Sequence, residues 1–147
     1  MLNGFLTPEL VLLNAGGVHT PEEAIRLAGS LMERAGKILP TYTEKMVEAL
    51  RTLGPYIVLA PGIAMPHANP DGGDVLENCV ALVTLKEPIP FGSAENDPVR
   101  LILALAGTEH GSHLEVLQTI GEVAGDPEKL KRLESASSYE DLEALLK

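Results

Sequence analysis

The sequence predicts an α/β fold: one β-sheet sandwiched between layers of helices, in a single domain spanning residues 1–147. Two observations predict it. Apolar runs of strand length occupy the middle of the chain, and amphipathic helix patterns come both before and after them. The chain is long enough to bury a core, and it contains neither an internal repeat nor a linker that would separate two domains.

The first third of the chain contains one candidate strand and two helix patterns. Residues 9–14, ELVLLN, are apolar enough for a strand. At residues 20–23, TPEE, the threonine can cap a helix, the proline suits the first helical position and the last glutamate completes a capping box. Apolar residues then recur at helical spacing up to Gly36. Residues 41–44, TYTE, repeat the capping-box spacing, and the apolar face that follows ends at Gly54.

Three apolar runs in the middle of the chain are the predicted strands. They are YIVLA at 56–60, CVALVTL at 79–85 and VRLILALA at 99–106. Continuous apolar runs of this length, rich in aliphatic and β-branched residues, are typical of strands that are covered on both faces. The sheet is therefore expected to be buried between its helices.

Three further helices are predicted in the C-terminal third. SHLE at 112–115 is a third capping box, and an apolar helix pattern follows it. Asp126 and Pro127 start a short helix that continues through Leu133, and residues 137–140 start a last one.

The net charge and the cysteine content limit which partners the protein can bind and in which cellular compartment it is expected. The 21 acidic and 11 basic residues give a formal charge of −10, which argues against nucleic acid and anionic membranes as partners. The single cysteine, Cys79, cannot form an internal disulfide, and its apolar surroundings predict that it is buried. The sequence shows no signal peptide and no apolar run of about 18 residues, so a cytoplasmic protein is expected.

The stretch from residue 56 to residue 73 presents a histidine in an unusual place. Gly62 permits a bend, Pro66 holds Met65 in extended geometry, and a loop rich in glycine and proline follows. His67 is therefore expected on a stiff turn at the lip of the sheet, where its strands end and where α/β proteins usually build their sites. An imidazole there can shuttle a proton, bind a metal or accept a group covalently; the plainer alternative is a loop histidine without a role.

A second histidine, His113, occupies the first position of the helix that Ser112 is expected to cap. The free N–H groups and the positive dipole end of a helix attract anions, phosphate above all. If His67 and His113 meet in space, the pair would suit a phosphorylated imidazole. The alternative is a histidine that merely starts a helix.

Three motifs resemble one known family. GIAMPHA at 62–68 resembles the active-site signature of the fructose/mannitol-type enzyme IIA proteins (EIIA type-2) of the bacterial sugar phosphotransferase system. The longer stretch at 54–68 is similar to the ascorbate-type branch in particular. The resemblance continues, in the same order, through PFGSAENDPVRLILALAG at 90–107 and SHLEVL at 112–117.

The resemblance implies a phosphocarrier. His67 would take a phosphoryl group from the phosphocarrier protein HPr, on an imidazole nitrogen that the sequence leaves undecided, and would pass it to a cysteine of a cognate enzyme IIB. The membrane component IIC would import the solute, L-ascorbate or a related carbohydrate. His113 would stabilise the phosphoryl group, and the only intermediate would be a covalent phosphohistidine, without a cofactor or metal.

The resemblance also implies a fold and a further candidate residue. The fold would be the mannitol/fructose-type phosphotransferase IIA fold, a mixed sheet with helices on both faces. Mannitol-type members carry an active-site arginine sixteen residues before the active histidine, and Arg51 stands at that spacing here. Arg51 is therefore a candidate phosphate ligand.

Two other functions remain open at this point. Phosphorylation of His67 could regulate the binding of another protein without any coupling to transport. Alternatively, Glu109, His110, His113 and His67 could hold a metal in a hydrolase, although Ser112 as the helix cap would leave His110 outside the helix. The aliphatic helix faces also leave a homodimer open.

Overall fold

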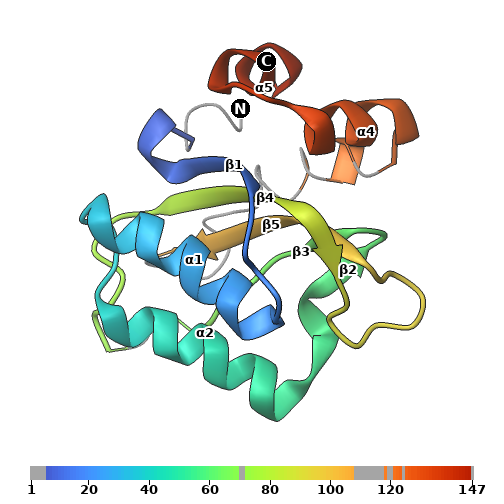
Figure 1. Cartoon of the computed structure of the whole chain (residues 1–147). Helices are drawn as coiled ribbons and strands as arrows, with labels where there is room; N and C mark the ends of the chain where they lie inside the picture. Colours follow the sequence, from blue (N-terminus) through green and yellow to red (C-terminus); the bar gives the residue numbers. More distant parts are fainter. Residues whose placement is uncertain (1–5, 70–71, 108–117, 119–120, 124, 147) are drawn as a thin grey trace.

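The structure is a computed structural model that describes residues 6–69, 72–107, 118, 121–123 and 125–146. Within these residues a five-stranded mixed sheet has the order β1-β4-β5-β3-β2 (Figure 1). The strands are β1 (Val11–Ala15), β2 (Val58–Ala60), β3 (Ile63–Ala64), β4 (Cys79–Ile89) and β5 (Val99–Ala106). The pairs β1–β4 and β3–β5 are parallel, whereas β4–β5 and β2–β3 are antiparallel.

Helices cover both faces of the sheet (Figure 1). They are α1 (Pro21–Arg34), α2 (Pro40–Leu53), α4 (Pro127–Ser135) and α5 (Tyr139–Leu146). The first two lie on one face and the last two on the other. This arrangement confirms the predicted α/β fold with a mixed sheet between helices.

The first two helices begin in different ways. At α1 the side chain of Thr20 accepts a hydrogen bond from the Glu23 amide at 3.1 Å, as the capping box predicts. The capping box predicted at residues 41–44 is wrong, because α2 begins two residues earlier than a cap at Thr41 implies, at Pro40, and has no side-chain cap. Proline has the φ of a helix and no N–H to satisfy, so it can start a helix without a cap.

The C-terminal helices follow the predicted signals closely. Asp126 caps α4 by accepting from two backbone amides. At α5 the cap is Ser138, which accepts from the Asp141 amide at 3.2 Å, so the predicted start at Ser137 is one residue early. The helix start predicted at Ser112 lies outside the described residues; of the helix that follows, Gln118 and residues 121–123 are described and are helical.

The strands near the candidate site are shorter than predicted. Residues Pro55–Ile57 form a 3-10 turn, η3, so the strand predicted over 56–60 is reduced to β2. Gly62, with φ of +77°, then turns the chain back into β3, which the sequence pattern did not separate from β2. A second 3-10 turn, η2 (Pro8–Leu10), precedes β1.

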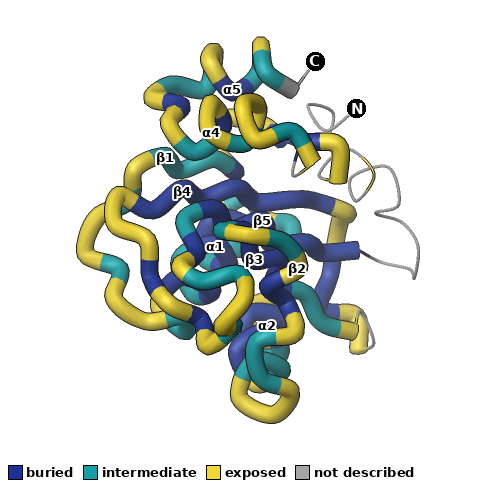
Figure 2. The backbone as a smooth tube through the Cα atoms, turned by 90° about the vertical axis from the view of Figure 1, so that its right-hand side faces the viewer, coloured by how far each residue is buried: buried dark blue, intermediate teal, exposed yellow. Residues whose placement is uncertain are grey.

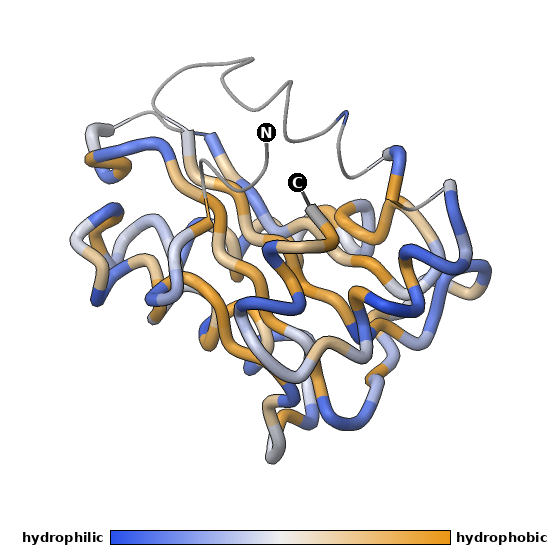
Figure 3. The backbone as a smooth tube through the Cα atoms, turned by 90° about the horizontal axis from the view of Figure 1, so that it is seen from above, coloured by the Kyte–Doolittle hydropathy of each residue, from blue (hydrophilic) through white to orange (hydrophobic). Residues whose placement is uncertain are grey.

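Two hydrophobic cores lie on the two faces of the sheet. Alternate residues of β4 divide between them: Cys79, Ala81 and Val83 face the core under α1 and α2, whereas Val80 and Leu82 face the core under α4 and α5. Figure 2 shows the buried strands at the centre, and Figure 3 shows hydrophobic residues concentrated along them. Both faces are covered, and this is why the strand sequences are continuously apolar.

Cys79 is buried, as predicted, with 1% of its surface exposed. Burial raises the pKa of its thiol to about 12. None of the described helices is both long enough and apolar enough to cross a membrane.

Candidate active site

The backbone that carries His67 is an extension of β3 along β5. The Leu105 amide donates to the Pro66 carbonyl at 2.9 Å, two residues beyond the end of β3. On the other side, the Met65 amide donates to the Ile57 carbonyl at 2.9 Å. His67 is therefore mounted on a segment that hydrogen bonds hold on both sides, three residues beyond the end of β3. The position where the strands end is as predicted, but the segment is extended and is not a turn.

The imidazole of His67 is half-buried and has a defined hydrogen bond. Its Nδ1 lies 2.7 Å from the carbonyl oxygen of Met65. A carbonyl oxygen can only accept, so Nδ1 carries the proton and, in the neutral ring, Nε2 keeps a lone pair. The ring therefore presents Nε2 as the nitrogen that can accept a proton or another group, a distinction that the sequence could not make.

Tyr56 lies against the His67 ring. The two ring centroids are 5.6 Å apart, with 70° between the ring planes, which is an edge-to-face contact. The Tyr56 hydroxyl also donates a long hydrogen bond of 3.4 Å to the His67 carbonyl. Because Tyr56 is 38% exposed, any macromolecule that reaches the imidazole from this side also meets the tyrosine.

Tyr42, on α2, holds the peptide that follows His67. Its hydroxyl accepts a hydrogen bond from the Ala68 amide at 3.1 Å and donates to the Leu105 carbonyl at 2.7 Å. The residue is 1% exposed, and burial raises its pKa to about 12. Neither Tyr42 nor Tyr56 was predicted as a site residue from the sequence, because no spacing rule relates a loop histidine to residues that approach it only in the folded chain.

A buried carboxylate lies further along the same loop. Asp74 is 3% exposed and forms an ion pair with Lys45 of α2, at 2.9 Å. Its backbone carbonyl accepts from the Leu39 amide at 2.9 Å. The loop that begins at His67 is thus tied to α2 at Tyr42 and again at Lys45.

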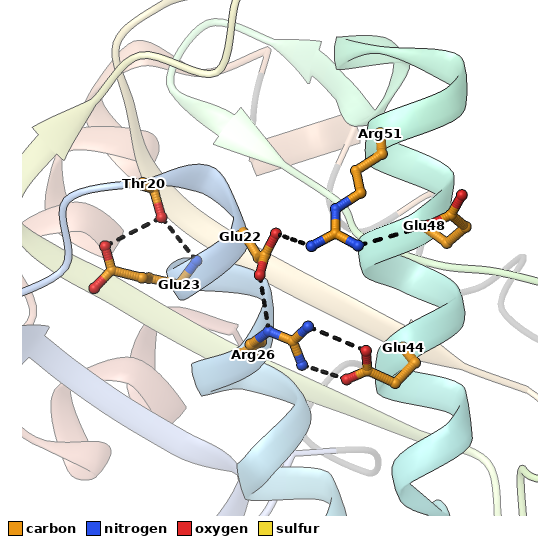
Figure 4. Close-up of polar contacts among 7 residues, drawn as sticks. All are labelled: Thr20, Glu22, Glu23, Arg26, Glu44, Glu48 and Arg51. Carbon is orange, nitrogen blue, oxygen red and sulfur yellow. Dashed lines mark hydrogen bonds and ion pairs between the residues drawn. The ribbon is translucent and has the colours of Figure 1, made fainter.

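Arg51 lies in an ion-pair network between α1 and α2 (Figure 4). Its guanidinium binds Glu22 of α1 at 2.6 Å and Glu48 of its own helix at 3.7 Å. Glu22 also binds Arg26, which in turn binds Glu44. The hydrogen bonds from Arg51 and Arg26 lower the pKa of the Glu22 carboxyl. Arg51 as a phosphate ligand remains a prediction.

The other predicted site residues fall outside the described part of the chain. These are His113, the predicted partner of His67, and Glu109 and His110 of the metal-site alternative. A meeting of His67 with His113 therefore stays a prediction. Among the described residues, no group of three or more histidine, cysteine, aspartate or glutamate side chains could hold a metal ion.

Comparison with known proteins gives consistent matches in sequence and structure. The family model described as "Phosphoenolpyruvate-dependent sugar phosphotransferase system, EIIA 2" matches residues 4–147. The ascorbate-specific PTS system EIIA component of Shigella boydii is 34% identical over 125 residues, which are 84% of this chain and 80% of that protein.

Two solved structures from Escherichia coli have the same fold. The crystal structure of IIA mannitol has a TM-score of 0.84 at 29% identity, over 97% of this chain and 99% of that one. A complex of enzyme IIA mannitol with phosphorylated enzyme IIB mannitol also gives 0.84, at 28% identity and over 96% of each chain.

Proposed function

The chain belongs to the EIIA 2 family of the phosphoenolpyruvate-dependent sugar phosphotransferase system, and from this premise we propose that it relays a phosphoryl group through His67. The donor is phosphorylated HPr, and the acceptor is a cysteine of a cognate enzyme IIB. The observation that carries the proposal is the 2.7 Å contact of Nδ1 with the Met65 carbonyl, which leaves Nε2 with its lone pair on a half-buried ring.

The first step transfers the group to this chain. The Nε2 lone pair attacks the phosphorus of the phosphohistidine on HPr. An N–P bond forms at His67 while the N–P bond of HPr breaks, and the electron pair of that bond stays on the HPr imidazole. In-line transfer of this kind depends on positioning and charge stabilisation, and its balance requires neither a metal nor a nucleotide.

The second step passes the group on. A cysteine thiolate of enzyme IIB attacks the same phosphorus, an S–P bond forms, and the Nε2–P bond breaks with return of its electron pair to Nε2. In support, one structural relative is a IIA mannitol protein in complex with phosphorylated IIB mannitol. The relay operates in the cytoplasm and serves the import of a solute by a membrane component IIC. The names of the relatives favour L-ascorbate or a related carbohydrate as that solute.

His113 and Arg51 are proposed to stabilise the phosphoryl group. A helix start at Ser112 would add backbone N–H groups to the His113 ring as donors. Arg51 would have to exchange its contacts with Glu22 and Glu48 for the phosphoryl oxygens. Since these ion pairs are exposed, the exchange is inexpensive in free energy.

The test is transfer of a radioactive phosphoryl group from HPr to wild-type protein, His67→Ala and His19→Ala. The last variant is a matched control, because His19 is an exposed histidine of a loop. Wild-type protein and His19→Ala should be labelled fully and His67→Ala not at all, while all three stay folded. Labelling of His67→Ala at the wild-type rate would overturn the proposal, and labelling without onward transfer to any IIB would favour a regulatory module.

A further inference from the structure

The parallel pairing of β3 with β5 continues up to His67. Ile63 is opposite Leu101 and Ala64 is opposite Ile102. The same register, continued by three residues, sets His67 opposite Leu105. In a parallel ladder such a pair has two hydrogen bonds: one from the Leu105 amide to the Pro66 carbonyl, and one from the Ala68 amide to the Leu105 carbonyl.

The first of these hydrogen bonds is present and the second is replaced. The Leu105 amide donates to the Pro66 carbonyl at 2.9 Å. In place of the second bond, the Ala68 amide donates to the Tyr42 hydroxyl at 3.1 Å, and that hydroxyl donates to the Leu105 carbonyl at 2.7 Å. One oxygen atom from α2 is thus inserted into the ladder at the residue pair that contains His67.

The inserted hydroxyl satisfies the hydrogen bonds of the Ala68 amide and the Leu105 carbonyl while it holds these two groups apart. Tyr42 is 1% exposed, so its side chain is out of contact with bulk solvent. The hydroxyl also lies 3.3 Å from the Ala68 carbonyl, but its single proton serves the nearer Leu105 oxygen. Because burial raises the pKa of Tyr42 to about 12, the hydroxyl keeps this proton at neutral pH.

We propose that Tyr42 is a positioning residue for phosphoryl transfer: its hydroxyl ends the β3–β5 ladder at His67 and holds the imidazole away from the sheet. Without the hydroxyl, the Ala68 amide can bond directly to the Leu105 carbonyl and draw His67 toward β5. That movement would also disturb the contact of Nδ1 with Met65, which sets Nε2 as the nucleophile. The inference rests on the proposed function of His67.

The kinetic test is Tyr42→Phe, which removes one oxygen atom and keeps the ring. The matched control is Tyr139→Phe, which removes a hydroxyl that donates to the Leu6 carbonyl at 2.8 Å in the core on the other face of the sheet. For Tyr42→Phe we expect kcat for labelling by phosphorylated HPr to fall by about 10- to 100-fold, because misplacement by about 1 Å has that effect. KM should change little, because the exposed surface is unaltered. Tyr139→Phe should keep the wild-type rate.

A second readout does not depend on phosphoryl transfer. In wild-type protein the Ala68 amide should be protected from hydrogen exchange, and the ¹⁵N shifts of the His67 ring should be those of the Nδ1–H tautomer. In Tyr42→Phe the ring shifts should move toward a mixture of tautomers, whereas Tyr139→Phe should leave them unchanged.

The outcomes separate this proposal from the proposed function. Wild-type kcat in Tyr42→Phe, or His67 ring shifts identical to wild type, would overturn the role of Tyr42. If Tyr42→Phe does not fold, an unprotected Ala68 amide in wild-type protein would overturn it instead. If His67 is not labelled even in wild-type protein, the proposed function fails, and the ring shifts still decide whether Tyr42 positions the imidazole.

Discussion

Gly29→Ala should destabilise the protein even though the change lies inside a helix. In an open helix position, alanine is favoured over glycine by about 1 kcal/mol. A Cβ atom at Gly29, however, would lie 2.5 Å from Oγ1 and 2.6 Å from Cγ2 of Thr43, on the facing helix α2. Thr43 cannot readily turn away, since it is buried and its hydroxyl donates to Glu33 at 2.7 Å.

The expected size of the effect follows from these two opposing terms. Overpacking of a core contact costs about 1–3 kcal/mol, and the helix preference of alanine offsets about 1 kcal/mol of it. The net loss of unfolding free energy is therefore about 1 kcal/mol, which corresponds to a fall in Tm of about 3 °C for a chain of this size. Urea and thermal denaturation followed by circular dichroism measure both quantities.

Gly121→Ala is the matched control, because Gly121 is helical and no described atom lies within 4 Å of the added Cβ. It should leave stability unchanged or raise it by up to about 1 kcal/mol. Thr43→Ala removes both close atoms, so Gly29→Ala should cost less in that background than in wild-type protein. A Gly29→Ala protein as stable as wild type, or an equal cost in both backgrounds, would refute the close contact of α1 with α2.

Three further predictions concern the pH dependence of stability, a buried ion pair and phosphoryl transfer. The pKa of the Cys79 thiol is raised from 9.0 to about 12 by burial, so above pH 9 the unfolded chain releases its proton first. The contribution of the Cys79 thiol to the unfolding free energy should therefore be fully present below about pH 9 and should be lost between about pH 9 and pH 12. The unfolding free energy should fall less steeply with pH in Cys79→Ala than in wild-type protein, and equal slopes in the two proteins would contradict this prediction. Lys45→Met should lower the unfolding free energy by about 2 kcal/mol, because it removes a cation from the buried Asp74 carboxylate. Lys37→Met removes the cation beside the exposed Glu77 and should lower the unfolding free energy by less than about 1 kcal/mol. Equal losses in Lys45→Met and Lys37→Met would contradict the role of burial at Asp74. Finally, Arg51→Ala and His113→Ala should fold but slow transfer to enzyme IIB, and wild-type rates would remove each residue from the site.

Much of the fold was predictable because the helix-start residues and the apolar runs of the sequence coincide with the helices and the buried strands of the structure. The threonine-proline pair at 20–21 starts α1, and the apolar run at 99–106 is β5, residue for residue. The family match confirms the resemblance found in three motifs. The errors lie where a neighbouring residue or a long-range contact decides the outcome. Pro40 starts α2 ahead of the expected cap, and the two residues of β3 form a strand because β5 and β2 pair with them on either side.

The candidate site was predictable only in part, and for the same reason. The proline and glycine residues around His67 predicted a stiff turn where the strands end. The structure has a stiff segment there, but this segment continues β3 along β5 and is not a turn. Tyr42 and Tyr56 contact the His67 segment across 26 and 11 positions of sequence. The choice between the two imidazole nitrogens depends on the Met65 carbonyl, a backbone atom whose direction no side-chain pattern reveals.

The decisive measurement for the phosphoryl relay through His67 is to locate the phosphoryl group after incubation with phosphorylated HPr. Tandem mass spectrometry at neutral or alkaline pH, combined with ¹⁵N NMR of the labelled ring, identifies both the residue and the nitrogen. We expect one phosphoryl group per chain, on Nε2 of His67. A phosphoryl group on another residue, or on Nδ1 of His67 with the contact to Met65 lost, would contradict it.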